Sequence, residues 1–196
     1  MVAPARTVGL GIAMADLQIW LVKAFASMTS VGALMRSAWM WPAAESVHFI
    51  GLSLLVGTII LFDLRLLGVA PRIPIGALHR LVPWGLVGYG LTLSSGVMFL
   101  MTEPDQYFYN PAFQFKVLFM AAAGVNAAAF YLSSFRQATV PGVHEAPPLA
   151  KAIATMSLCL WLAVIVAGRL ITFYRPWPCE PPGPGIIATC IPDVAE

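Results

Sequence analysis

Charged side chains are scarce in this sequence of 196 residues: 10% are Asp, Glu, Lys or Arg, whereas 59% are hydrophobic. A soluble domain carries about 25% charged residues, so the composition excludes an ordinary soluble domain and indicates a chain built for lipid. The net charge of +2 is small, and no basic run is present, which excludes a nucleic-acid partner. The sequence has no P-loop, GxGxxG or GxSxG motif, and we expect no autonomous enzymatic activity.

Cysteine is also rare, with three residues in the chain. Cys179 and Cys190 bracket a C-terminal segment too rich in Pro and Gly to be helical. We predict that they form a disulfide in an oxidising compartment; the alternatives are two free thiols or a pair of metal ligands. Cys159 falls inside a long hydrophobic run, where we expect it to be a small packing residue.

Long hydrophobic runs are abundant. Four of them exceed the roughly 20 apolar residues that a membrane-spanning helix needs. They are continuous rather than alternating in polarity, which favours helices over the strands of a β-barrel. We therefore predict an all-α, polytopic membrane protein, a bundle of four transmembrane helices in the lipid bilayer. The predicted spans are Trp41–Leu67, Ile75–Met101, Ala112–Phe135 and Leu149–Tyr174.

The first 40 residues are harder to place. Apolar residues between Leu17 and Met35 follow a one-faced helical pattern that Lys23 and several hydroxyl residues interrupt. We favour an amphipathic helix lying in the membrane interface; the alternative is a fifth span. We expect no cleaved signal peptide, because the apolar stretch starts late. The predicted domains are an N-terminal interfacial helix region (1–40), the four-helix bundle (41–175) and a Pro-rich tail (176–196).

The links between spans differ in charge. The links after the first and third spans are basic, and the link Thr102–Pro111 is acidic and aromatic. Basic links stay on the cytoplasmic side, so we predict that Thr102–Pro111 and the C-terminus lie outside. The basic residues of the inner links are Arg65, Arg72, Arg80, Arg136 and Lys151.

Four ionisable side chains fall inside the predicted spans: Glu45, His48, Lys116 and Arg169. At 1.5 Å per residue, this topology places all four within roughly 4–10 Å of the outer boundary. Ionisable groups in a membrane usually face a bundle interior and pair there. Met98 reaches the same level, whereas His79 lies near the inner face, about 20 Å or more away.

Three kinds of site fit this outer group. The first is a buried polar network of Glu45, His48, Lys116 and Arg169 that binds no cofactor. The second is a haem b site, with His48 as axial ligand of the iron, Glu45 beside it, and Lys116 and Arg169 pairing with the propionates. Met98 or water would then be the sixth ligand. The third is a transition-metal site, such as copper bound by His48 with Met98 or Met101.

The first span carries a resemblance in the motif Trp41-Pro42-x-x-Glu45-x-x-His48-x-x-Gly51, followed by Asp63-Leu64-Arg65-Leu66-Leu67-Gly68. With Asn110-Pro111-x-Phe113-Gln114-x-Lys116 and Gly168-Arg169, it resembles an uncharacterised family of bacterial inner-membrane proteins over roughly residues 35–175. The resemblance implies a bacterial inner membrane and no established activity. The four-helix plan is also similar to b-type cytochrome and copper-resistance membrane bundles, by fold-level analogy alone.

Taken together, these features lead us to expect a small membrane subunit of a larger redox or energy-transducing complex, with haem b at the outer group and a role in electron transfer. The alternatives are a cofactor-free accessory subunit that packs against other membrane subunits, and a metal-handling membrane protein. The C-terminus is expected to be periplasmic.

Overall fold

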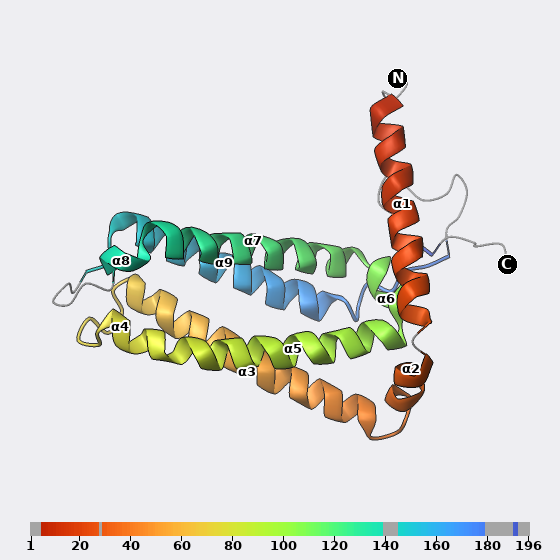
Figure 1. Cartoon of the computed structure of the whole chain (residues 1–196), viewed down its shortest axis with the longest axis horizontal. Coiled ribbons are helices and arrows are strands. Elements are labelled where there is room, and N and C mark those ends of the chain that lie inside the picture. Colours follow the sequence, from red (N-terminus) through yellow and green to blue (C-terminus); the bar gives the residue numbers. More distant parts are fainter. Residues whose placement is uncertain (1–4, 28, 139–144, 179–189, 192–196) are drawn as a thin grey trace. The chain divides into compact units, whose positions relative to one another are not determined.

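A computed structural model describes residues 5–27, 29–138, 145–178 and 190–191, and within these ranges the regular elements are all helices. The all-α prediction is therefore confirmed (Figure 1). In chain order the helices are α1 (Ala5–Ala26), α2 (Thr29–Met35), α3 (Met40–Leu66), α4 (Ile75–Leu78), the 3-10 turn η1 (His79–Leu81), α5 (Val82–Thr102), α6 (Pro104–Phe108), α7 (Pro111–Ser133), α8 (Phe135–Ala138) and α9 (Pro148–Leu170).

The chain divides into two compact units, each of which is described by itself. The bundle unit consists of Pro42–Gly96 and Lys116–Val166. The terminal unit consists of Met1–Trp41, Val97–Phe115 and Ala167–Glu196. Within the bundle unit, the segments of α3, α5, α7 and α9 run side by side as four long rods (Figure 1).

Among the residues that the structure describes, four helical stretches are long and apolar enough to cross a membrane: α3, the stretch Ile75–Thr102, α7 and α9. Even the shorter ones, at 23 residues, measure about 35 Å at 1.5 Å per residue, against a hydrocarbon core of about 30 Å. The four predicted spans are thus confirmed, with ends that differ by at most four residues, and the chain is a multi-pass membrane protein.

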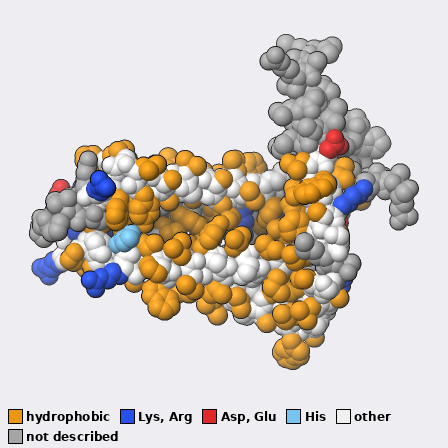
Figure 2. All heavy atoms as spheres, viewed as in Figure 1, with side chains coloured by type: hydrophobic (Ala, Val, Ile, Leu, Met, Phe, Trp, Pro, Cys, Tyr) orange, Lys and Arg blue, Asp and Glu red, His pale blue; other side chains and the backbone are white. Residues whose placement is uncertain are grey.

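The bundle unit has an apolar outer surface, as helices in lipid require. Large apolar side chains point outward, for example Phe49 at 57% exposed and Leu118 at 60%, while Ala150 and Ala154 are fully buried. Small residues inside and large ones outside let membrane helices approach closely while presenting an apolar surface to lipid. Figure 2 shows this apolar coat, with Lys and Arg gathered at the end where α4 and α8 lie. Cys159, predicted to be a small packing residue, is exposed and therefore belongs to the outer surface.

At the basic end of the bundle unit, a buried arginine, Arg65, holds the loop that follows α3. This side chain is only 3% exposed, and its guanidinium donates hydrogen bonds to the carbonyl oxygens of Ile73 (2.5 Å) and Pro71 (3.1 Å). The chain reverses just before these residues, where Gly68 has a φ of 101° that favours glycine. Arg65 therefore fixes the loop between α3 and α4 and is not the exposed loop charge that its position in the sequence suggested.

Helices α3 and α5 make a backbone-to-backbone crossing at Gly51 and Gly88. A Cβ atom added to Gly88 would lie 2.5 Å from the carbonyl oxygen of Gly51, and one added to Gly51 would lie 2.8 Å from that of Gly88. Both distances are shorter than real side chains tolerate. These glycines therefore serve close helix packing, the ordinary use of small residues in membranes.

In the terminal unit, α1 packs on α6. The amide of Gln18 donates to the carbonyl oxygen of Phe108 at 3.0 Å, and the rings of Phe25 and Phe108 lie 5.5 Å apart. The described part of α1 has 22 residues but is not among the four stretches apolar enough to span. An interfacial helix for this region stays a prediction, as does its alternative, a fifth span.

Asn110 is the polar centre of the terminal unit. It is fully buried at 0% exposed, and its Oδ1 accepts a hydrogen bond from the Ala112 backbone N–H at 2.9 Å, which caps the start of α7. Its amide nitrogen donates to the carbonyl oxygens of Ile171 (2.9 Å) and Tyr174. A single side chain thus joins the start of α7 to the residues that follow α9.

Replacing Asn110 with serine is expected to destabilise the protein by roughly 1–2 kcal/mol, because serine keeps a cap oxygen but cannot reach the two carbonyls. Thermal unfolding in detergent measures the effect. The control is Gln106→Ser, which removes a longer, half-buried hydrogen bond (3.2 Å) to the same Ile171 oxygen. An equal loss in both variants would mean that Asn110 has no special role.

Asp105 in α6 lies outside the spans, and burial raises the pKa of its carboxyl from the ordinary 3.8. A raised pKa in the folded state means that folding favours the neutral acid, so stability falls as the pH rises from 3.8 through the folded-state value. We expect Asp105→Asn to match the wild type at low pH and to be the more stable protein at neutral pH. Melting curves of both proteins across this pH range test it; parallel curves would refute it.

Candidate functional site

The His48 imidazole is held by α5. Its Nδ1 atom lies 2.9 Å from the hydroxyl oxygen of Ser95, which is 3% exposed. The Ser95 hydroxyl is in turn 2.7 Å from the carbonyl oxygen of Leu91 on its own helix. The imidazole also hydrogen-bonds the backbone of Thr92. His48 on α3 is therefore oriented by a polar patch on one face of α5, all within the bundle unit.

The contacts favour the imidazole tautomer with its proton on Nδ1. The Ser95 hydroxyl has one proton, and it can give this proton to the Leu91 carbonyl while accepting from an N–H at Nδ1 of His48. In this tautomer the lone pair is on Nε2. Histidines that bind a metal or haem iron through Nε2 usually have Nδ1–H fixed in this way by a hydrogen-bond acceptor.

Two neighbours complete the surroundings of His48 within the bundle unit. A Cβ atom added to Gly96 would lie 3.7 Å from Cε1 of the imidazole, so a glycine faces the edge of the ring. Lys116, half-buried near the start of α7, is close enough for its charge to act on His48. The sequence analysis placed His48 and Lys116 in one site, and in the structure both lie in the bundle unit.

The other predicted site residues are not joined to this pair. Glu45 is exposed, and within the described residues the ion pair recorded is Lys151 with Glu145, at 3.9 Å. Met98 and Arg169 belong to the terminal unit, where Arg169 is exposed and lies over the ring of Phe173, 5.3 Å from its centre. Their roles beside His48 stay predictions.

His79 is separate from His48, as predicted. It lies in η1, 16 residues before Ser95 on one helical stretch, which corresponds to roughly 24 Å along the axis. Its Nε2 atom is 3.3 Å from the Tyr131 hydroxyl, and its ring packs on Phe135 at 4.8 Å. The two histidines therefore cannot bind one metal ion together.

Two polar contacts were not foreseen from the sequence. Ser95 on α5 is the partner of His48. Asp63, near the end of α3, is 6% exposed and hydrogen-bonded by Ser157 of α9. A serine on the buried face of an otherwise apolar helix is the sequence signal that points to such contacts, since buried hydroxyls find partners.

The side chains around His48 offer one imidazole ligand, which suits a haem iron better than a metal ion bound by side chains alone. Among the described residues, no three His, Cys, Asp or Glu side chains gather as metal ligands. A haem iron needs only one or two axial ligands from the protein, because the macrocycle supplies the others. The oriented imidazole of His48 would bind the iron, and the nearby cation of Lys116 would pair with a propionate. Gly96 is small and leaves space at the edge of the imidazole.

Residues 37–174 match the model of a protein family described as a family of unknown function (DUF6644). The matched stretch is more than half of the chain. It includes all four spans and the five residues predicted around the outer site, and it ends before the Pro-rich tail. The resemblance to an uncharacterised family is thus confirmed. Neither a curated protein nor a solved structure matches the chain.

Proposed function

The chain belongs to the DUF6644 family, and we propose that it is a small integral-membrane subunit of a larger redox or energy-transducing complex, with haem b bound through His48. The observation that supports this most is the chain of hydrogen bonds from His48 to Ser95 (2.9 Å) and from Ser95 to the Leu91 carbonyl (2.7 Å). A buried serine that presents its lone pair to Nδ1 prepares the opposite nitrogen, Nε2, for an iron.

Each side chain near His48 would have a defined role. Lys116 would pair with a propionate carboxylate and offset its negative charge in the membrane. Gly96 would leave room at the edge of the imidazole. From the sequence alone, Met98 is a further candidate for an iron ligand, Arg169 for a propionate partner, and Glu45 for an electrostatic neighbour. When bound, haem b supplies reversible one-electron transfer.

We place the protein in the bacterial inner membrane with the His48 site near the periplasmic face. The support is the basic end of the bundle unit, where Arg72, Arg80 and Arg136 are exposed. Basic links remain cytoplasmic. His48 lies eight residues from the start of α3, the end away from the basic link, so it falls toward the opposite side of the bilayer. Electron partners of the proposed subunit would then approach from the periplasmic side.

The proposed orientation predicts a periplasmic disulfide between Cys179 and Cys190. Cys179 lies outside the described residues. Support comes from the adjacent residues: the Ile191 N–H donates to the Trp177 carbonyl at 2.8 Å, and Pro178 pairs with Ile191. Closing so short a loop would stabilise the tail by about 3 kcal/mol in the chain-entropy model.

A membrane-impermeant maleimide tests both the disulfide and the orientation. We expect the reagent to label spheroplasts with an intact inner membrane only after reduction, at the two tail cysteines. Cys159 is the internal control, because it lies on the lipid-facing surface of a span and should stay unlabelled. Labelling without reduction would contradict the disulfide, and labelling from the cytoplasmic side alone would contradict the orientation.

A cofactor-free accessory subunit is the alternative that a specific observation favours. Gly51 and Gly88, which could have admitted a flat macrocycle, pack against each other instead. The exposed Glu45 would then serve contacts with other membrane subunits. Optical spectra of the purified protein separate the two functions. Haem b gives a Soret band and an α band that sharpens on dithionite reduction; a colourless, iron-free preparation would exclude it.

A further inference from the structure

The basic end of the bundle unit carries positive charge that its own carboxylates do not neutralise. Arg72, Arg80 and Arg136 are all exposed. Of the acidic residues described there, Asp63 is buried, and Glu145 already pairs with Lys151 at 3.9 Å. Figure 2 shows the Lys and Arg side chains gathered at this end, beside the apolar coat of the helices. Positive charge next to a lipid-facing surface complements an anionic lipid headgroup.

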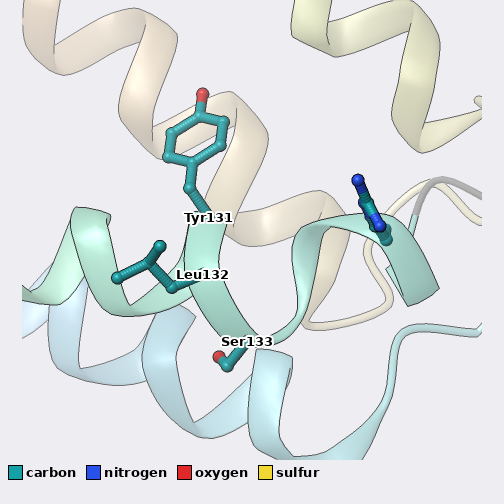
Figure 3. A pocket seen from close by; sticks show the side chains of 4 residues that line it. Tyr131, Leu132 and Ser133 are labelled. Atoms are coloured by element: carbon teal, nitrogen blue, oxygen red, sulfur yellow. The ribbon is translucent and has the colours of Figure 1, made fainter.

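A recess at the end of α7 lies in this region. It has a volume of about 380 Å³ and is lined by Tyr131, Leu132, Ser133 and Arg136. In Figure 3 the side chains of Tyr131, Leu132 and Ser133 point to different sides of the last turn of α7, so they do not converge on one enclosed pocket. A ligand here would lie along the outside of the helix end, which suits a lipid better than a soluble substrate.

The lining residues divide into a polar part and an apolar part. Arg136 is exposed, and its planar guanidinium matches the oxygen atoms of a phosphate. The Tyr131 hydroxyl, 3.3 Å from Nε2 of His79, is a second polar group in the lining. Leu132 is 89% exposed and presents an apolar surface directly to lipid. The combination has a phosphate-binding end and an acyl-chain end.

We propose that this recess binds an anionic phospholipid, with Arg136 contacting the phosphate and Leu132 the acyl chain. Arg72 and Arg80 raise the local concentration of anionic lipid through their charge. The site does not depend on haem, because it lies at the opposite end of the bundle unit from His48. The full-length protein therefore binds phosphatidylglycerol in preference to phosphatidylcholine.

Native mass spectrometry of the detergent-purified protein, titrated with each lipid, measures this preference. Arg136→Gln is expected to weaken phosphatidylglycerol binding about fivefold and to leave phosphatidylcholine binding unchanged. Lys151→Gln is the matched control: it removes one positive charge at the same end, but from a residue already paired with Glu145. Its phosphatidylglycerol affinity should stay close to that of the wild type.

Three outcomes would overturn the proposal. Equal weakening in both variants would mean a diffuse attraction to negative charge and no site at Arg136. Equal affinity of the wild type for the two lipids would mean no headgroup recognition. Displacement of phosphatidylglycerol by inorganic phosphate at similar concentration would mean a site for free phosphate rather than for lipid. Thermal unfolding without lipid checks that Arg136→Gln still folds.

Discussion

Replacing His48 with alanine is expected to abolish the Soret band of the purified protein, because the axial ligand to the iron is lost. His79→Ala is expected to keep the band. His79 contacts Tyr131 and lies about 24 Å along the helical stretch from Ser95, the partner of His48. Both variants remove one imidazole from the bundle unit, so their comparison separates ligation from a general loss of packing.

Ser95→Ala makes this test specific for the proposed geometry. The variant keeps the ligand but removes the acceptor at Nδ1, and losing such a supporting contact typically weakens a metal site 10–100-fold. We expect a band that titrates at correspondingly higher haem concentration. Circular dichroism confirms that each variant remains helical. An unchanged haem affinity in Ser95→Ala would remove the main support for the haem proposal, even if His48→Ala lost its band.

Replacing Gly88 with alanine is expected to destabilise the bundle unit by roughly 2–3 kcal/mol, because the new methyl group meets backbone rather than a flexible side chain. The added Cβ would lie 2.5 Å from the Gly51 carbonyl oxygen and 2.7 Å from the Leu55 backbone nitrogen. Relief requires α3 and α5 to move apart. For a chain of this length, such a loss lowers the unfolding midpoint by about 5–10 °C.

Gly90→Ala is the matched control, two residues further along the same helix. A Cβ atom at Gly90 meets nothing within 4 Å, and alanine is the better helix former by up to about 1 kcal/mol. Its midpoint should equal or exceed that of the wild type. Similar midpoints for the two variants would show that α3 and α5 are further apart at Gly51 and Gly88 than in this structure.

The spans were predictable because they depend on composition over 20 or more residues, which single interruptions do not obscure. The burial of Asp63 and Arg65 was not predictable, because charges at the end of a hydrophobic run usually mark the start of a solvated loop. The chain instead turns back at Gly68 and presents its carbonyls to the Arg65 guanidinium. That bond depends on loop geometry, which no periodicity of the sequence encodes.

The candidate site was half predictable. His48 and Lys116 stood out because ionisable groups are costly in hydrocarbon. Ser95 did not, because a hydroxyl in a helix can satisfy itself on a carbonyl of the preceding turn, as Ser95 does on Leu91. Only the register of α5 against α3 shows that the same hydroxyl also faces His48. That register follows from the Gly51–Gly88 crossing, whose glycines the sequence alone could not assign to packing or to a ligand.

The hydrogen bonds of Asn110 also bear on the order in which the chain is built. Its amide partners, Ile171 and Tyr174, lie 61 and 64 residues later in the sequence. In a chain emerging from the ribosome, Asn110 appears before Ile171 and Tyr174, so its amide must wait for the residues that follow the last helix. Release of the nascent chain before residue 171 would leave this amide without its acceptors. Such products would be open to quality-control proteases at the unfinished end, while the earlier helices are already in the bilayer.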